Sequence, residues 1–92
     1  MAEQRIRRRV VVNGRVQGVF FRDSTRQQAA RHGVAGWVTN RSDGAVEAVL
    51  EGSPQAVDRV LQFISEGPPH ARVQDVDVRE EQPEGLSGFR IR

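Results

Sequence analysis

The feature that most constrains the fold of this chain is a helix signal with a clear beginning and a clear end, set between strand-like segments. It starts at Ser53-Pro54, an N-cap residue followed by proline at the first helical position, and stops before Gly67. Between these ends, apolar residues recur at positions i, i+3, i+4 and i+7, namely Val57, Val60, Leu61 and Ile64. This spacing predicts an amphipathic helix over Pro54–Glu66 with one buried face.

A second helix is predicted near Asp23–His32, where alanine, glutamine and arginine, all good helix formers, predominate. Four residues of this region share one helical face by their spacing: Phe21, Thr25, Ala29 and His32. Gly33 stands at the position where a left-handed residue ends many helices. The chain therefore has two helices that require an apolar surface to cover.

Strand-like segments surround both helices. Arg5–Asn13 is rich in β-branched valine, and the residues around the Asp43-Gly44 turn signal predict a hairpin. Val73–Glu81 predicts a further strand, and a shift in its alternating pattern near its start indicates a β-bulge. The last four residues, Phe-Arg-Ile-Arg, predict a short end strand.

The resulting order, β-α-β-β-α-β with a short end strand, predicts an α+β fold of the ferredoxin-like split βαβ type. We expect a single domain over residues 1–92, with an antiparallel sheet covered on one face by both helices. The uncovered face is expected to be wetter, since Glu47 and Glu51 alternate with apolar residues in the third strand.

Charge and residue usage exclude several classes of function. All 14 basic residues are arginine, and 12 acidic residues nearly balance them, so the surface is not a general polyanion-binding field. Four arginines form an N-terminal cluster that we expect to be solvated: Arg5, Arg7, Arg8 and Arg9. The absence of cysteine excludes disulfides and thiolate metal sites. Because the sequence shows no long apolar run and no secretory signal, we expect a cytoplasmic protein that does not enter a membrane. We also expect a monomer, because nothing in the sequence suggests a large apolar surface patch.

The stretch Gly14–Arg22, GRVQGVFFR, joins the first strand to the first helix. Gly14 and Gly18 permit backbone angles that other residues avoid, and no proline removes an amide from this loop. Amides at the start of a helix carry positive partial charge, and consecutive loop amides form a nest for anions. Arg22 adds a guanidinium suited to phosphate oxygens. The spacing alone leaves two alternatives open, an anion site or a tight turn.

Catalytic groups are scarce elsewhere in the sequence. The two histidines, His32 and His70, provide no evident base for Ser24 or Thr25, and the carboxylates show no metal-ligand spacing. This shortage favours a substrate whose leaving group needs no acid. An acyl phosphate releases a carboxylate whose conjugate acid has a pKa of about 4, and phosphoryl transfer to water requires mainly positioning and charge stabilisation.

Three segments resemble the acylphosphatase family: GRVQGVFFR at residues 14–22, GWVTNRSDGAVEAVLEG at residues 36–52 and GFRIR at residues 88–92. The resemblance implies a ferredoxin-like enzyme that hydrolyses acyl phosphates to carboxylate and inorganic phosphate without metal or cofactor. It implies that Arg22 binds the phosphate and that Asn40 orients the attacking water. The position of Asn40 alone favours a different role, that of a turn-entry residue whose side chain bonds its own backbone. The amides that the resemblance places around the phosphate belong to Val16, Gln17, Gly18, Val19 and Phe20.

Other classes of function remain open on sequence. RNA-recognition domains share this fold but carry exposed aromatic residues on their sheets, whereas the third strand here, AVEAVLE, has none, so we expect no nucleic acid partner. The main alternative to an enzyme is a non-catalytic ferredoxin-like domain that binds a phosphoanion or another small ligand. A further alternative is a non-catalytic acylphosphatase-like domain of the kind that is fused to larger carbamoyl-transfer proteins. The expected partners are therefore a small acyl phosphate as substrate and inorganic phosphate as product.

Overall fold

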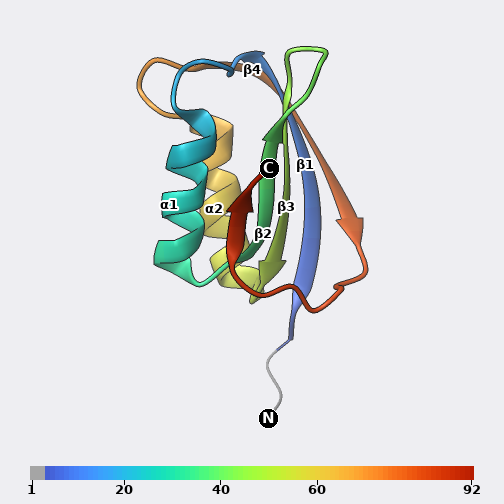
Figure 1. Cartoon of the computed structure of the whole chain (residues 1–92). Helices are drawn as coiled ribbons and strands as arrows, with labels where there is room; N and C mark the ends of the chain where they lie inside the picture. The colour runs from blue at the N-terminus through green and yellow to red at the C-terminus, as the bar shows by residue number, and fades with distance from the viewer. Residues whose placement is uncertain (1–3) are drawn as a thin grey trace.

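The computed structural model describes residues 4–92, which form a five-stranded sheet and two helices (Figure 1). The elements follow one another as β1 (Ile6–Arg15), α1 (Phe21–His32), β2 (Ala35–Asn40), β3 (Val46–Gly52), α2 (Pro54–Glu66), β4 (Arg72–Glu81) and β5 (Phe89–Ile91). The strands lie in the order β4-β1-β3-β2-β5, and both helices cover the same face. The predicted order of elements and the ferredoxin-like α+β fold are confirmed. No helix among residues 4–92 is long and apolar enough to cross a membrane.

The sheet is mixed rather than wholly antiparallel. The four longer strands pair antiparallel, as predicted, whereas β5 runs parallel to β2, with Gly36 opposite Phe89 and Val38 opposite Ile91. The cause is the connection over residues 82–88, which carries the chain from β4 at one edge of the sheet across its end to β2 at the other edge (Figure 1). Because β2 also starts at that end of the sheet, β5 runs in the same direction as β2.

The core lies between the sheet and the helices. β1, β3 and α2 supply most of its fully buried side chains: Val10, Val12, Val46, Ala48, Leu50, Val57, Val60 and Ile64. α1 adds three of the four residues predicted for its buried face, while His32, the fourth, is half-buried. The predicted helix ends are confirmed at Ser53, whose side chain accepts a hydrogen bond from the Ala56 amide, and at Gly33, which is left-handed.

The predicted bulge lies where β1 approaches the glycine loop. The pairing of β1 with β4 shifts between Asn13 and Gly14, so that Gln74 is the extra residue of β4. Gly14 has a φ of 130°, and a Cβ atom built on it would collide with the carbonyl oxygen of Arg72. A glycine is therefore required at this point of the strand pair.

α1 begins at Phe21, two residues before its predicted start. Its N-cap is Phe20, which is left-handed (φ 62°, ψ 25°) and makes no side-chain capping bond. Phe21 is only 2% exposed, because its ring packs in the core, and this burial fixes the first turn of the helix directly after the loop. Asp23 lies inside that first turn, where its charge is favourable to the helix dipole.

The expectation that Glu51 lies on a wet face is wrong, and so is the expectation that Arg7 belongs to a solvated cluster. Glu51 is 0% exposed and Arg7 is 4% exposed. Arg7 donates from Nη1 to Glu51 at 2.7 Å and from Nε to Glu81 at 2.8 Å. The physical reason is the connection over residues 82–88, which covers this end of the helix-free face. It donates three backbone amides to the Glu51 carboxylate, from Glu84, Gly85 and Leu86.

Candidate active site

A pocket of about 320 Å³ lies at the end of the sheet where β1 is joined to α1. Four segments line it: the glycine loop, the first turn of α1, the end of β2 and the end of β5. The lining residues are Val16, Gly18, Phe20, Phe21, Arg22, Asp23, Asn40 and Ile91. The fold therefore brings Arg22 and Asn40, the two residues expected from the sequence to be catalytic, into one pocket.

The glycine loop presents backbone amides without protein partners. Among residues 4–92, no amide from Val16 to Phe20 donates to a protein acceptor, and the first helical bond runs from the Ser24 amide to the Phe20 carbonyl at 3.0 Å. The amides of the first helical turn also lack intrahelical acceptors. Gly18 and Phe20 are both left-handed, with φ values of 74° and 62°. Such a loop forms a concave set of donors that suits an anion.

Arg22 supplies an uncompensated positive charge at this pocket. Its side chain is half-buried in the first turn of α1, and no carboxylate of the described chain lies within ion-pair distance of it. The neighbouring carboxylate, that of Asp23, instead accepts hydrogen bonds from Arg26 and Gln27, both at 3.1 Å. The guanidinium of Arg22 is therefore available to an anion in the pocket.

Asn40 ends β2 and carries an unpaired buried acceptor. Its Oδ1 atom is inaccessible to solvent yet accepts no hydrogen bond from residues 4–92. Asp43 builds the turn instead, since its carboxylate accepts a bond from the Ala45 amide at 3.1 Å. That amide bond, followed by the Arg41 guanidinium, lowers the pKa of Asp43. A buried acceptor without a protein partner is typical of a group that binds a ligand or a water molecule.

Two residues expected around the phosphate turn their side chains away from the pocket. Gln17 donates from Nε2 to the carbonyl oxygens of Arg41 and Ala45, at 2.8 and 2.9 Å, and so ties the glycine loop to the β2–β3 turn. Val19 is 8% exposed and packs in the core. For both residues, the expected role concerns only the backbone amide. Ile91 is a pocket residue that the sequence did not reveal, because a four-residue end segment carries no signal of where it pairs.

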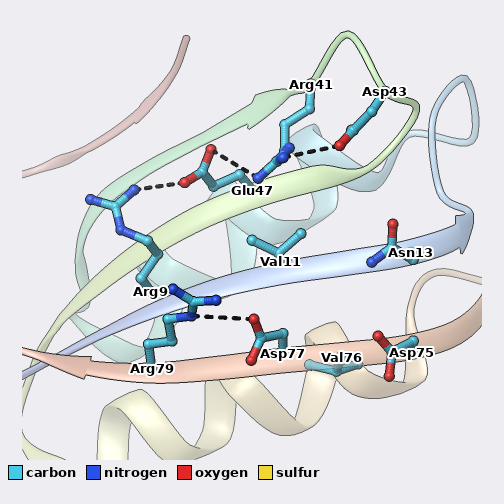
Figure 2. A pocket seen from close by; sticks show the side chains of 10 residues that line it. All are labelled: Arg9, Val11, Asn13, Arg41, Asp43, Glu47, Asp75, Val76, Asp77 and Arg79. Carbon is cyan, nitrogen blue, oxygen red and sulfur yellow. Dashed lines mark hydrogen bonds and ion pairs between the residues drawn. The ribbon is translucent and has the colours of Figure 1, made fainter.

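A larger pocket of about 660 Å³ lies on the helix-free face of the sheet (Figure 2). Many of the charges that line it neutralise one another: Arg9 donates to Glu47 at 2.7 Å and Arg79 to Asp77 at 3.3 Å. The larger pocket therefore has less unpaired positive charge for binding an anion than the smaller pocket has. Within the described part of the chain, no group of three or more His, Cys, Asp or Glu residues is placed to hold a metal ion.

A family model described as Acylphosphatase matches residues 8–91. The chain belongs to the acylphosphatase family. A curated relative named Acylphosphatase, from Rubrobacter xylanophilus, is 59% identical over 92 residues, covering 99% of this chain and 84% of that protein. A solved acylphosphatase structure from Coxiella burnetii has a TM-score of 0.91 and 41% identity, covering 96% of this chain and 93% of that chain. Every residue that lines the candidate site lies within the region that the acylphosphatase model matches.

The acylphosphatase fold also occurs inside a much larger protein. The structure of full-length HypF in its phosphate- and nucleotide-bound form has a TM-score of 0.91 and 27% identity to this chain. The match covers 99% of this chain but only 12% of that chain. A fold of this kind therefore also occurs as one part of a much longer chain.

Proposed function

We propose that this member of the acylphosphatase family hydrolyses the carboxyl–phosphate bond of acyl phosphates by direct attack of water. The glycine loop and Arg22 hold the phosphoryl group, and Asn40 orients the water. Hydrolysis of this acid anhydride is the activity of the family. The observation that carries the residue roles is the meeting, in one pocket, of unpaired donors with one unpaired buried acceptor.

The donors at this pocket suit the oxygens of a phosphoryl group. Loop amides and the start of α1 point partial positive charge at the pocket, and Arg22 adds a full charge with a planar fork. As water attacks, negative charge is shared among the phosphoryl oxygens. Donors that are already in place stabilise that charge without having to reorganise.

The Asn40 Oδ1 atom gives the water its orientation. Asn40 lines the pocket, and in the substrate complex its Oδ1 atom accepts one O–H of the water, which directs the water oxygen toward phosphorus. A side-chain amide has no useful basicity at neutral pH, so the proton passes to a phosphoryl oxygen of the substrate. The bond from water oxygen to phosphorus forms as the bond from phosphorus to the acyl oxygen breaks, and the electron pair of that bond leaves on the carboxylate.

No general acid is required for this reaction. The leaving carboxylate is stable at neutral pH, since its conjugate acid has a pKa of about 4. Asp23, the one carboxylate that lines the pocket, is held by Arg26 and Gln27 on its own helix. We accordingly propose that neither metal nor cofactor takes part, and that acyl phosphate and inorganic phosphate are the partners.

The same proposal describes a cytoplasmic monomer that binds no nucleic acid. On the helix-free face, where an RNA would stack its bases, β3 presents Glu47 rather than an aromatic residue. The one tryptophan of that region, Trp37, lies beneath the guanidinium groups of Arg9 and Arg92, at 5.5 and 4.5 Å from its ring centre. A ring covered in this way offers little surface to a base.

The test is hydrolysis of benzoyl phosphate by the purified protein in EDTA, with inorganic phosphate as a competitive inhibitor. We expect turnover without added metal, and its loss in Arg22→Gln. The matched control is Arg59→Gln, which removes an exposed arginine of α2 that makes no ion pair within residues 4–92. A folded protein that binds phosphate but does not accelerate hydrolysis would support the non-catalytic binding domain instead.

A further inference from the structure

We propose that Phe20 and Ile91 form an apolar ledge that binds the acyl group of the substrate and gives the enzyme a preference for aromatic and large aliphatic acyl phosphates. This inference rests on the proposed function, because it places the rest of the substrate once the phosphoryl group is in the cradle. Both residues line the same pocket as Arg22 and Asn40.

Phe20 has two properties that the fold does not explain. Its side chain is 79% exposed, the most exposed large apolar side chain of the described residues. It is also the one non-glycine residue among residues 4–92 with a positive φ, a conformation that costs free energy for a bulky side chain. An aromatic ring that is held in solvent by an unfavourable backbone makes no contribution to the core. Strain of this kind is concentrated at ligand sites.

Ile91 reaches the pocket from the other side. It is 40% exposed and lies on β5, opposite Val38 of β2. The strand is fixed beside β2 by two bonds at its end: the Arg92 amide donates to the Val38 carbonyl at 2.9 Å, and the Thr39 hydroxyl donates to the Arg92 carbonyl at 3.0 Å. Since Asn40 ends β2, two residues after Val38, Ile91 lies close to the residue proposed to hold the water.

The division of the pocket fits the division of the substrate. Arg22 and Asn40 form its polar part, whereas Phe20, Ile91 and the buried Val16 form an apolar part. An acyl phosphate has the same two parts, joined through one oxygen atom. A phenyl or branched aliphatic acyl group would cover the exposed ring of Phe20 and bury apolar surface, which a methyl group does to a much smaller extent. A second carboxylate on the acyl group would meet the negative charge of Asp23 instead.

The test compares kcat/KM for benzoyl phosphate and acetyl phosphate in four proteins: the natural sequence, Phe20→Asn, Ile91→Ala and Val78→Ala. Asparagine tolerates the left-handed backbone, so Phe20→Asn removes the ring and keeps the loop conformation. Val78→Ala is the matched control, because Val78 is 45% exposed on β4 and does not line this pocket. We expect the benzoyl-to-acetyl ratio to fall about tenfold in Phe20→Asn and about threefold in Ile91→Ala, on the scale of lost apolar contact. Val78→Ala should leave the ratio unchanged.

A second measurement keeps the inference independent of turnover. Benzoylphosphonate and acetylphosphonate, which lack the scissile bond, are titrated against the same proteins by calorimetry. The Kd of acetylphosphonate divided by the Kd of benzoylphosphonate should fall, more in Phe20→Asn than in Ile91→Ala. Ratios within twofold of the natural protein in both variants would overturn the ledge, and so would a Phe20→Asn protein that no longer binds inorganic phosphate. Failure of the proposed function is recognised separately, as a natural protein that hydrolyses neither substrate while it still discriminates between the phosphonates.

Discussion

Two arginines, Arg7 and Arg22, differ in whether carboxylates of the protein neutralise their charge. Arg7 lies at the end of the sheet covered by the 82–88 connection, where its guanidinium contacts three carboxylates, those of Glu51, Glu81 and Glu84, at 2.7, 2.8 and 3.4 Å. Arg22 lies at the glycine loop and has no carboxylate within ion-pair distance in residues 4–92. One guanidinium is saturated by the protein, and the other is left for a ligand.

The remaining polar groups of each region follow the same division. At the Arg7 end, the Glu51 carboxylate accepts hydrogen bonds from three backbone amides as well as from the Arg7 guanidinium. At the Arg22 end, loop amides donate to no protein group and the Asn40 Oδ1 atom accepts no bond within the described chain. Saturated charges fix the long connection onto the sheet, whereas unsaturated groups can act on a substrate. The difference predicts that changes at one end alter stability and that changes at the other alter turnover.

Arg22→Gln should produce the largest effect. Glutamine removes both the charge and the bidentate fork, so we expect kcat/KM for benzoyl phosphate to fall about a thousandfold, the upper range for one lost donor at a site of developing charge. The free energy of unfolding should change by less than about 0.5 kcal/mol, since no protein partner is lost. Urea unfolding and steady-state kinetics on the same preparation check this. A marked loss of stability would place Arg22 among the structural charges.

Glu51→Gln should have the opposite profile. It leaves Arg7 partly unpaired in a buried site and weakens the bonds to the 82–88 amides, so we expect a loss of about 3 kcal/mol in the free energy of unfolding. At a temperature where the variant is folded, its turnover should stay within about twofold of the natural protein. The exposed substitution Glu80→Gln serves as the control. A folded Glu51→Gln protein with greatly reduced turnover would show that the two ends are coupled.

Acid should act mainly on the Arg7 end. Burial by itself would raise the pKa of Glu51, but the Glu84 amide, the Arg7 guanidinium and the amides of Leu86 and Gly85 together lower it from 4.5 to about 2. A carboxyl group whose pKa is lowered by folding stabilises the protein fully above its unfolded pKa, and this stabilisation is lost as the pH falls through the folded pKa.

We therefore expect stability to decline between about pH 4.5 and pH 2, with Glu51 contributing on the order of 3 kcal/mol. The pKa of Glu81 is also lowered, by Arg9 and then by Arg7, and acts in the same direction. Thermal unfolding across this range checks the sign. In Glu51→Gln the loss of stability with falling pH should be much shallower than in the natural protein. An equally steep loss in both proteins would show that other groups cause the acid sensitivity.

Asn40→Ala should have a smaller effect than the loss of Arg22. If Oδ1 orients the water, turnover falls about a hundredfold, the scale of one lost positioning group, while inhibition by inorganic phosphate persists. Ser42→Ala, an exposed change in the same turn, is the control. Near-normal turnover in a folded Asn40→Ala protein would refute the water-orienting role.

The order of elements could be predicted because each helix carries its own local signals. The Ser53-Pro54 start, the apolar stripe that follows it and the Gly33 end act through neighbouring residues, and all three are found in the structure. The buried charges could not be predicted in this way. Arg7 in β1 and Glu51 in β3 each follow an apolar residue, which is the usual pattern of a strand with one solvated face. Their burial depends on the 82–88 connection, and no local sequence signal places that connection over them.

The candidate site likewise has residues that local sequence signals predict and residues that depend on tertiary packing. The glycine loop and Arg22 form one continuous segment, so their proximity was evident from the sequence. Asn40 became a candidate through the resemblance to the acylphosphatases, and the structure places it in the same pocket, while its role stays a prediction. Ile91 and the left-handed Phe20 depend on tertiary packing, namely on the parallel pairing of β5 and on the burial of Phe21, and sequence periodicity carries neither.

The most direct test of the central claim is the affinity for inorganic phosphate, measured by titration calorimetry on the natural protein, Arg22→Gln and Glu51→Gln. Loss of a charge-assisted hydrogen bond costs about 1.5–3 kcal/mol, so Kd should rise at least tenfold in Arg22→Gln. It should be unchanged in Glu51→Gln, whose charges are already satisfied within the protein. Equal phosphate affinity in the natural protein and in folded Arg22→Gln would contradict the claim that the unpaired guanidinium beside the glycine loop holds the phosphoryl group.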